Sequence, residues 1–410
     1  MKLRDYQQQI VNKAVSVLEQ YKFVYLAMEV RTGKTLTSLS IAEVFCGVGN
    51  VLFITKKKAI PSIRADYNLL SPNYDIHIIN YESLHKIPKV RWAMVICDEA
   101  HGLGAFPKAS KRAKQVRSLI AHNLPYVILL SGTPTPESYS QMYHQVYGIP
   151  NNPFNNYKNF YRFSDDYVNV TVKPIGGVHI RDYSKGLKSI LYKMQPYTIS
   201  YTQKEAGFIV DTNEKILYVD VKPEIKKLIK RLTKDRVIQG KDDVILADTP
   251  VKLMSKTHQL YSGTVKFESG KAMVLDNSKA HFIKKYFEGK KIAIFYKFTA
   301  EYQAIVDVFG DSVCNTLDEF CNTKKNIALQ IVSGREGISL KEADALVYYN
   351  IDFSATSYWQ SRDRMTTKDR KYNKLFWIFS KNGIEDNIYK AVVKKKDYTL
   401  NHFKRDLLNL

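Results

Sequence analysis

A short apolar run followed by Gly-Lys-Thr most constrains how this chain can fold. Residues 23–27 are rich in strand-forming side chains, and residues 36–45 have the apolar spacing of a helix. Gly-Lys-Thr at 33–35 lies between them. A strand, a loop ending in these three residues and a helix together form the context of a phosphate-binding loop. The sequence therefore predicts that residues 26–35 bind a polyphosphate.

Each residue of the triplet has its own expected role. Gly33 lets the backbone approach a polyphosphate, and Lys34 places a positive charge near the β- and γ-phosphates. Thr35 offers a hydroxyl to Mg²⁺, while the helix N-terminus supplies oriented N–H groups. Met28 stands where such loops usually have their first glycine. The triplet alone therefore leaves an ordinary strand–turn–helix open as an alternative.

The net charge of the chain indicates which class of molecule it binds. The chain has 62 Lys and Arg against 40 Asp and Glu, which gives a formal charge of +22. Such a charge favours a polyanion, above all nucleic acid, because phosphate neutralisation releases counterions. The basic residues are spread along the chain, so we expect a long groove rather than a basic tail. A basic surface that serves only solubility is the alternative.

The cysteines and the hydropathy pattern indicate a reducing compartment. Cys46, Cys97, Cys314 and Cys321 form no CxxC pair, which disfavours a zinc site. The N-terminus lacks an apolar signal region, and no apolar stretch approaches membrane-spanning length. We therefore expect a cytoplasmic protein that has no membrane partner.

Apolar strands alternate with helical segments in the first part of the chain. Strands are expected at 23–27, 51–55, 76–80, 92–97 and 126–130, and an amphipathic helix over 1–20. This alternation predicts a parallel sheet with helices on both faces. In such sheets ligands bind beyond the carboxyl ends of the strands.

Three polar motifs follow these strands and should meet at that edge. They are Gly-Lys-Thr at 33–35, Asp98-Glu99, and Ser-Gly-Thr at 131–133. Asp98 would hold Mg²⁺ through water, and Glu99 would orient and deprotonate the attacking water. An isolated Asp-Glu pair is usually a solvated turn. Its occurrence about 60 residues after Gly-Lys-Thr favours the catalytic interpretation.

The full length predicts an α/β protein with two tandem parallel-sheet lobes. We expect lobe 1 over 1–150, an insert over 151–210, lobe 2 over 211–395 and a basic C-terminal helix over 396–410. The insert contains a candidate β-hairpin at 168–181 with a Gly-Gly turn. Further strands are expected at 215–221, 292–296, 326–332, 345–350 and 375–380, and a basic helix at 223–238.

Sequence blocks spread over nearly the whole chain resemble the motifs of superfamily 2 helicases, most closely those of the Swi/Snf-like branch. The blocks lie at 3–7, 26–35, 98–101, 131–134, 294–298, 334–340 and 360–364. Asp-Glu-Ala-His at 98–101 is the DEAH box of such enzymes. The resemblance implies two RecA-like lobes, ATP and Mg²⁺ as cofactors, and DNA as the partner. The chain is also similar to stand-alone phage or bacterial helicases. This similarity implies a location in the bacterial cytosol or in a phage-infected cell.

The resemblance also assigns roles to residues. The implied catalytic set is Lys34, Asp98, Glu99, Gln360 and Arg364. The implied ATP-binding set is Arg4, Tyr6, Gln7, Glu29, Arg31, Thr32, Gly33, Lys34, Thr35 and Gly337. Thr35 and Asp98 would hold Mg²⁺, and Ser131 and Thr133 would couple hydrolysis to movement. The implied DNA contacts are Lys56, Lys57, Asn80, Tyr81, Lys297, Phe298, Ser333, Gly334 and Arg335. Lys173, Ile175, Gly176 and Gly177 form a candidate wedge.

One departure from the family concerns its arginine finger. The family usually has a further arginine three positions after Arg364, where this chain has Thr367. Arg364 is our candidate for the finger, with Arg362 and Arg370 as alternatives. A finger typically contributes about 10³–10⁵ in rate.

The expected activity is ATP-driven movement along DNA. By resemblance, ATP would bind between the lobes, and loss of its γ-phosphate would open them. We expect unwinding or branch migration of forked or junction DNA, in replication, recombination or repair. Alternatives are a duplex translocase that does not separate strands, a non-hydrolysing nucleic-acid clamp, and an RNA-directed enzyme. The sequence does not identify protein partners.

Overall fold

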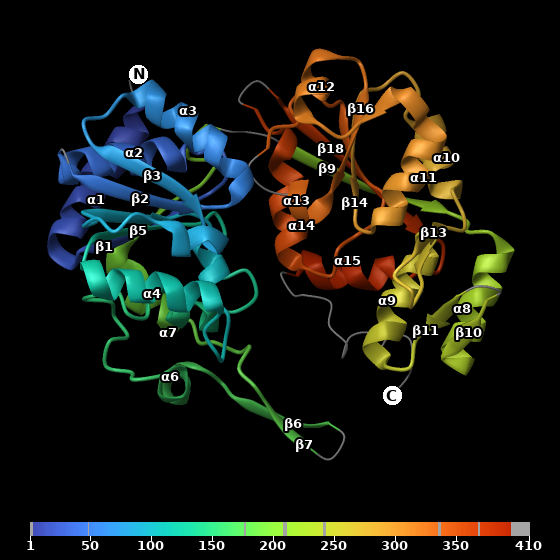
Figure 1. Ribbon diagram of the computed structural model, residues 1–410, viewed down its shortest axis with the longest axis horizontal. Coiled ribbons are helices and arrows are strands. Elements are labelled where there is room, and N and C mark those ends of the chain that lie inside the picture. The colour runs from blue at the N-terminus through green and yellow to red at the C-terminus, as the bar shows by residue number, and fades with distance from the viewer. Residues whose placement is uncertain are drawn as a thin grey trace. The chain divides into compact units, whose positions relative to one another are not determined.

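Two six-stranded parallel sheets, one in each half of the chain, organise the structure (Figure 1). The computed structural model describes residues 3–47, 49–175, 178–207, 211–240, 243–334, 338–367 and 370–394. The chain divides into two units, Met1–Phe208 and Ile209–Leu410. The predicted α/β class with two parallel sheets is confirmed.

The first sheet contains every strand predicted for the first lobe and one more. Its order is β3 (Asp75–Asn80), β2 (Asn50–Thr55), β4 (Met94–Cys97), β5 (Tyr126–Leu130), β1 (Phe23–Met28) and β8 (Thr198–Tyr201). β8 comes from the segment expected to be an insert. It pairs in parallel with β1, with Tyr25 opposite Thr198 and Met28 opposite Tyr201. The insert therefore returns to the first sheet before the chain leaves this unit.

Both faces of the first sheet are covered, which explains its uninterrupted apolar strands. On one face Val24 and Leu26 pack against α1 (Asp5–Tyr21), α2 (Lys34–Cys46) and α3 (Ile60–Leu70). On the other face Phe23 and Tyr25 pack in a cluster with α4 (Lys111–Asn123) and α5 (Met142–Val146). Figure 1 shows α2 and α4 on opposite sides of the sheet.

Helix α1 begins at Asp5 rather than at the first residue. The Arg4 backbone N–H donates to Gln7 Oε1 at 3.0 Å, which satisfies one of the free donors at the helix start. Its predicted apolar face is buried, from Ile10 to Leu18. The sequence at 3–7 is therefore both a helix start and part of the site described below.

The segment before β8 contains the predicted hairpin. β6 (Thr171–Ile175) and β7 (Val178–Asp182) are antiparallel, with Thr171 opposite Asp182. The predicted turn residues Gly176 and Gly177 lie outside the described residues. α6 (Phe160–Tyr167) and α7 (Ser189–Met194) flank the hairpin in sequence. Phe160 and Phe163 of α6 are buried and belong to the core of this unit, whereas Tyr161 is 44% exposed.

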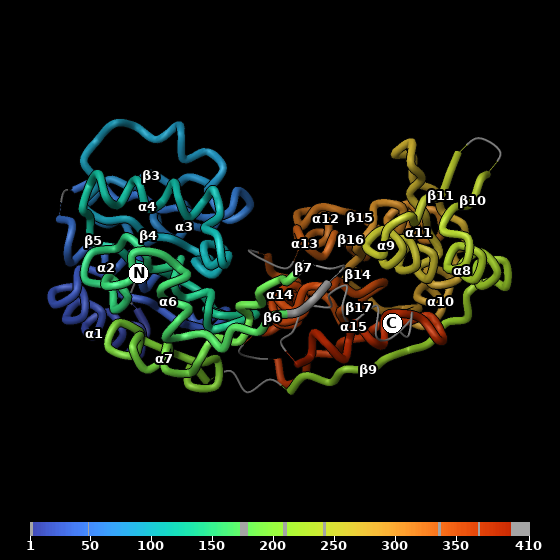
Figure 2. The backbone as a smooth tube through the Cα atoms, turned by 90° about the horizontal axis from the view of Figure 1, so that it is seen from below, coloured from blue at the N-terminus to red at the C-terminus, as the bar shows by residue number. Residues whose placement is uncertain are grey.

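The second sheet has the order β15 (Val313–Cys314), β16 (Asn326–Gln330), β14 (Ile292–Tyr296), β17 (Ala345–Tyr348), β18 (Tyr372–Ser380) and β9 (Asp211–Val219). β9 forms one edge of this sheet (Figure 2) and pairs with β18 over their whole length. α10 (Ser278–Tyr286) and α11 (Thr299–Phe309) cover one face. The other is covered by α8 (Pro223–Asp235), α9 (Pro250–Tyr261), α14 (Ala355–Ser361) and α15 (Glu385–Val393).

Two short antiparallel pairs in the second unit were not predicted. They are β10 (Val237–Gln239) with β11 (Val244–Leu246), and β12 (Thr264–Lys266) with β13 (Ala272–Val274). The helix expected to reach residue 238 stops at Asp235, because Arg236 adopts the left-handed conformation with φ 64°. Within the described part of this unit, the remaining α-helices are α12 (Leu317–Asn322) and α13 (Ile331–Gly334), and the helix expected over 396–410 lies outside the described residues. Among the described residues, no helix is long and apolar enough to cross a membrane.

Candidate functional site

The loop between β1 and α2 depends on a glycine at position 33. Gly33 caps α2 with φ 80°, a left-handed conformation that glycine adopts without strain. A Cβ at this position would lie 2.2 Å from Gln7 Nε2. The same Gln7 nitrogen donates to the Gly33 carbonyl at 3.4 Å. Gly33 is thus required both for the turn and for the close approach of α1.

Lys34 folds back over the loop that precedes it. Its Nζ donates to the carbonyl of Met28 at 2.9 Å and to that of Glu29 at 3.2 Å. A Cβ built on Gly132 would lie 3.5 Å from the same Nζ. The ammonium group therefore lies where the 26–35 loop and the 131–133 motif meet, and carbonyl contacts of this kind can be exchanged for phosphate oxygens.

Asp98 is held from two sides at the end of β4. The Thr55 hydroxyl donates to Asp98 Oδ2 at 2.8 Å, and the Tyr81 hydroxyl donates to the Asp98 carbonyl at 2.6 Å. Burial, followed by the neighbouring Glu99 charge, raises the pKa of Asp98 to about 6. The Lys34 charge opposes this shift.

Glu99 begins a polar chain that leads to the 131–133 motif. Its Oε2 lies 3.2 Å from His101 Nδ1, which lies 3.0 Å from Ser131 Oγ. Ser131 Oγ also accepts the Thr133 backbone N–H at 3.1 Å. The acidic pair and the predicted coupling residues Ser131 and Thr133 are thereby connected through His101, which the residue assignments from sequence did not include.

The donor set at this edge fits Mg²⁺. Thr35 lies in the first turn of α2, and Asp98 offers a positioned carboxylate. Mg²⁺ prefers oxygen ligands and is usually bound by one or two carboxylates together with substrate phosphates. A divalent cation would also offset the repulsion between the Asp98 and Glu99 carboxylates.

The predicted ATP-binding residues at the start of α1 lie beside the same loop. The Tyr6 hydroxyl donates to the Thr32 carbonyl at 3.1 Å, and Arg4 Nη1 donates to that hydroxyl at 3.3 Å. Thr32 Oγ1 donates to the Glu29 carbonyl at 2.7 Å. Arg31 adopts φ 63°, a left-handed conformation that is uncommon for residues other than glycine. The start of α1 and the 29–33 loop are therefore one structural assembly.

Residues after β8 complete this assembly and were missed by sequence reasoning. The Gln203 backbone N–H donates to Glu29 Oε2 at 2.7 Å, and its Nε2 donates to the Val30 carbonyl at 3.0 Å. The Glu29 N–H donates to the Tyr201 carbonyl at 2.9 Å. Gln203 follows Glu29 by 174 positions, so no local pattern could have indicated the contact.

The predicted DNA contacts of the first unit divide into exposed and buried groups. Lys57 follows β2 and is exposed, whereas Lys56 is partly covered. Asn80 Nδ2 donates to Glu82 at 3.0 Å. The assignment of Tyr81 to DNA needs correction: its side chain is buried, and its hydroxyl positions the backbone of Asp98.

The predicted DNA contacts of the second unit are occupied by partners within that unit. Lys297 forms an ion pair with Asp352, and its Nζ lies 4.1 Å from the Phe353 ring centroid. Phe298 packs 5.3 Å from the His258 ring. Both side chains therefore have partners within the second unit, and a DNA contact by Lys297 would require its ion pair with Asp352 to open.

Two further predicted DNA contacts, Ser333 and Gly334, lie in α13 directly after β16. Ser333 Oγ donates to the Gln330 carbonyl at 3.1 Å. Gly334 is buried, and a Cβ there would lie 2.7 Å from the Phe295 ring. Gly334 is therefore needed for packing, and its assignment as a DNA contact stays a prediction. Arg335 and Gly337 lie outside the described residues.

The three arginines considered for the finger differ in their surroundings. Arg364 is buried, and its Nε donates to the carbonyl of Gln360, also buried, at 2.9 Å. Arg362 forms an ion pair with Glu214 and lies over the rings of Tyr358 and Trp359 at 5.0 and 4.9 Å. Arg370 Nη2 donates to the Ala343 carbonyl at 2.7 Å.

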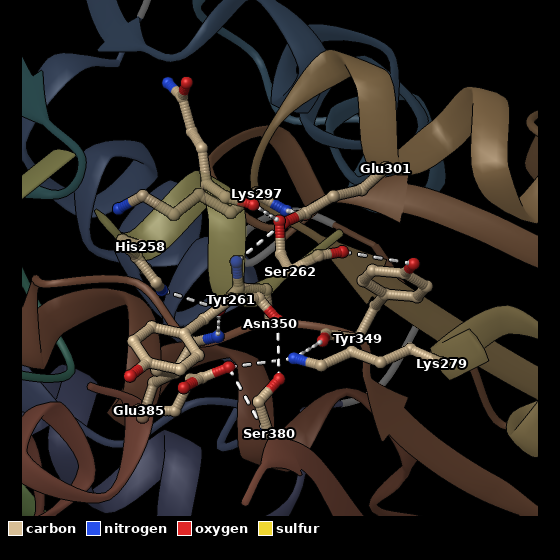
Figure 3. A network of polar contacts seen from close by, with 12 residues as sticks. His258, Tyr261, Ser262, Lys279, Lys297, Glu301, Tyr349, Asn350, Ser380 and Glu385 are labelled. Atoms are coloured by element: carbon tan, nitrogen blue, oxygen red, sulfur yellow. Dashed lines mark hydrogen bonds and ion pairs between the residues drawn. The ribbon is translucent and has the colours of Figure 1, made fainter. Parts of the chain in front are cut away.

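A buried polar network supports the loops that follow β14 and β17 (Figure 3). His258 Nε2 lies 2.6 Å from Asn350 Oδ1, and Asn350 Nδ2 donates to Glu301 Oε1 at 2.6 Å. Glu301 Oε2 accepts the backbone N–H of Lys297 at 2.7 Å. Burial holds the pKa of His258 well below its usual value, so the ring is neutral.

A buried ion pair extends this network. Lys279 Nζ lies 2.9 Å from Glu385 Oε1, and both side chains are almost completely buried. The Ser380 backbone N–H also donates to Glu385 Oε1, at 3.4 Å. Figure 3 shows the ion pair below Asn350, within the same unit. The polar groups at this location connect α10, β18 and α15, and their arrangement is that of a structural network.

Comparison with known proteins gives family matches over much of the chain. A family model described as the SNF2-related domain matches residues 49–269, or 221 of the 410 residues. A second, described as the res subunit of type III restriction enzymes, matches residues 1–87. The ISWI chromatin-remodeling complex ATPase ISW1 of Saccharomyces cerevisiae is 21% identical over 96% of this chain. The chain spans 40% of the length of that relative.

Two solved structures are also similar. The SWI2/SNF2 ATPase core of Sulfolobus solfataricus in complex with dsDNA is 16% identical, with a TM-score of 0.43, over 100% of this chain and 93% of that one. The ATP-dependent type ISP restriction-modification enzyme LlaBIII bound to DNA is 12% identical, with a TM-score of 0.54, over 99% of this chain and 30% of that one. The second likeness indicates a shared fold.

Proposed function

We propose that this chain, which belongs to the family of SNF2-related domains, is a DNA-stimulated ATP hydrolase that moves along duplex DNA. The observation that carries the proposal is the meeting of three motifs at one edge of the first sheet. Lys34 lies over its own loop and beside Gly132, and Glu99 is connected through His101 to Ser131. An ordinary strand–turn–helix has no need of such an arrangement.

The residues of the first unit have distinct proposed roles in hydrolysis. Lys34 exchanges the carbonyls of Met28 and Glu29 for the β- and γ-phosphate oxygens of ATP. Thr35 and Asp98 would hold Mg²⁺, which would neutralise phosphate charge when bound. Glu99 orients the attacking water and accepts its proton.

The remaining roles concern coupling and the second unit. Ser131 and Thr133 respond to the state of Glu99 through His101. Gln360 and Arg364 are the proposed contributions of the second unit, with Arg364 stabilising the charge that develops on the transferred phosphoryl group. Arg362 and Arg370 are the alternative arginines, and all three have partners within the second unit.

Duplex DNA is the proposed track because of the charge of the chain and its family. A formal charge of +22 favours contacts to phosphates, which are largely independent of base sequence. Exposed Lys57 is a proposed contact of this kind. Binding should therefore weaken steeply as salt rises.

The test is steady-state ATP hydrolysis with and without duplex DNA, on the full chain and on Lys34→Ala. We expect DNA to stimulate the wild-type rate and Lys34→Ala to lose hydrolysis under both conditions. RNA duplex and forked DNA serve as comparison substrates. A wild-type protein that binds duplex DNA but does not hydrolyse ATP would instead be a nucleic-acid clamp, which contradicts the proposal.

The β6–β7 hairpin favours strand separation as a second candidate function. Its described part exposes two apolar side chains, Val172 at 55% and Ile180 at 49%. Exposed apolar side chains on a ribbon are suited to insertion between base steps. Lys173 and Ile175 lie on β6, within the proposed wedge.

A hairpin replacement tests the wedge. Thr171 and Asp182 are paired, so a short Gly-Ser linker can replace 171–182 without displacing the flanking chain. We expect unwinding of forked DNA to be lost and DNA-stimulated hydrolysis to remain. Unwinding at the wild-type rate, or a wild type that does not unwind forks, would reject the wedge and leave the duplex translocase.

A further inference from the structure

Residues 201–207 comprise the last residue of β8 and the turn after it, are called the 201–207 turn, and are hydrogen-bonded to the phosphate-binding loop. β8 lies beside β1, and Tyr201 is opposite Met28, the last residue of β1. Because the two strands are parallel, the chain leaves both at the same edge of the sheet. The topology therefore delivers the 201–207 turn next to residues 29–33, although the intervening chain includes most of the first unit.

Three hydrogen bonds connect the turn to the loop. Gln203 supplies two of them, from its backbone N–H to Glu29 Oε2 at 2.7 Å and from its Nε2 to the Val30 carbonyl at 3.0 Å. The third runs from the Glu29 N–H to the Tyr201 carbonyl at 2.9 Å. The side chain of Gln203 thus binds the carbonyl that follows the two carbonyls contacted by Lys34.

The turn has internal bonds that fix its own shape. Glu205 accepts both the backbone N–H and the hydroxyl of Thr202, each at 2.7 Å. The Ala206 N–H donates to the Thr202 carbonyl at 3.1 Å. A turn closed in this way can hold Gln203 in one position. The Gln203 side-chain amide is then preorganised to donate a hydrogen bond to the Val30 carbonyl.

An aromatic stack closes the assembly on its other side. The rings of Tyr6 and Tyr201 are stacked, with centroids 4.7 Å apart and planes 11° from parallel. The Tyr6 hydroxyl donates to the Thr32 carbonyl at 3.1 Å. Residues 29–33 are therefore held from α1 at one end and from the 201–207 turn at the other, and the two supports contact each other.

We infer that Gln203 is a positioning residue for the phosphate-binding loop. This inference rests on the proposed ATP-binding function. When Lys34 leaves the carbonyls of Met28 and Glu29 for phosphate oxygens, these carbonyls lose a partner, and the loop needs another constraint to keep its shape. Gln203 provides it at Val30, and the chain that provides it leads directly into the second unit at residue 209.

The inference predicts a selective effect of removing the Gln203 amide. Gln203→Met keeps the length of the side chain and removes the donor to Val30. Loss of one neutral hydrogen bond should raise the KM for ATP by about threefold to tenfold. We expect kcat at saturating ATP and the unfolding temperature without nucleotide to stay close to wild type. The thermal shift produced by a non-hydrolysable ATP analogue should be smaller than for wild type.

The matched control is Gln239→Met. Gln239 is exposed on β10 in the second unit, and its Nε2 donates to Gly240 at 3.4 Å. This variant should leave the KM for ATP unchanged. Tyr201→Leu, which removes the stack with Tyr6, is a second test and should also raise KM without lowering the unfolding temperature.

The outcomes separate this inference from the proposed function. A wild type that hydrolyses ATP with dependence on Lys34, together with a wild-type KM in both Gln203→Met and Tyr201→Leu, would overturn the inference alone. A Gln203→Met protein with a lowered unfolding temperature and a parallel loss of kcat would also overturn it, because the residue would then be structural. A wild type that neither binds nor hydrolyses ATP would refute the proposed function itself.

Discussion

The two units use polar residues differently at the same edge of the same kind of sheet. In the first unit, Lys34 contacts loop carbonyls that it can exchange for a ligand. In the second, Lys297 is paired with Asp352 and Arg362 with Glu214, so their charges are already balanced. Parallel sheets place motifs together in both units, but the partners of each side chain decide whether the motif binds a ligand or supports the fold.

This difference has an energetic consequence. A buried ion pair contributes little net stability, but removing one partner leaves a buried charge and costs about 3–5 kcal/mol. Substitutions in the second unit should therefore act mainly on stability. Substitutions at the carboxyl edge of the first sheet should act mainly on catalysis.

Arg364 is the strongest test of this difference between the two units, because it belongs to the second unit and yet has a proposed catalytic role. Arg364→Ala should lower kcat by about 10³-fold or more if it is the arginine finger. Arg362→Ala should instead lower stability, since it removes the cationic partner of Glu214. Steady-state hydrolysis and thermal unfolding of both variants decide between them. A larger loss of kcat in Arg362→Ala would transfer the role to that residue.

The Lys279–Glu385 pair tests whether substitutions in the second unit act mainly on stability. Lys279→Met leaves Glu385 buried without its partner and should cost about 3–5 kcal/mol of unfolding free energy in urea. ATP affinity should be unaffected. The control is Lys381→Met, which breaks an exposed pair with Asp220 and should cost about 0–1 kcal/mol. Equal costs for the two variants would show that burial does not govern the network.

The pH dependence of stability and of activity tests the proposed role of Asp98. Its pKa is raised to about 6 from the usual 3.8, so its protonated form is favoured in the folded protein. The stability that this group contributes is fully present below pH 3.8 and is lost as pH rises through about 6. Its activity should follow the opposite course, since the carboxylate is needed for Mg²⁺.

Two measurements check this prediction. The value of kcat/KM should fall about tenfold for each pH unit below 6. Asp98→Asn should be more stable than wild type at pH 7, and the difference should shrink towards pH 4. A constant difference between the two proteins would mean that Asp98 is ionised normally in the folded state.

The smallest expected effect concerns DNA contacts. Lys57 is exposed in the first unit, whereas Lys297 is paired in the second. Lys57→Ala should reduce the salt dependence of duplex binding by about one unit of slope, uniformly across sequences. Lys297→Ala should leave the slope unchanged. The reverse result would show that the Lys297–Asp352 pair opens when DNA binds.

The strands of both sheets were predicted well because parallel strands that are buried on both faces appear in the sequence as short apolar runs. The sequence also predicted which motifs meet, since residues after neighbouring strands share one edge. β8 and Gln203 could not be found in this way. Their place depends on a pairing between distant strands, Tyr25 with Thr198, that no local pattern specifies.

Individual side chains were harder to predict than the motifs that contain them. Tyr81 follows a strand, as a DNA contact would, but its ring is buried and its hydroxyl holds Asp98. Lys297 and Gly334 belong to recognisable blocks, yet Asp352 and Phe295 determine what they contact. A motif gives the position of a residue in the fold, whereas its partners come from elements distant in sequence.

The most direct test of the account is ATP binding and hydrolysis by Glu99→Gln in the presence of duplex DNA. The substitution keeps the size of the side chain and a polar contact to His101, but removes the proposed base. We predict that the variant binds ATP with an affinity close to wild type and hydrolyses it about 10²–10⁴ times more slowly. Hydrolysis at the wild-type rate would contradict the claim that the edge of the first sheet is the catalytic site.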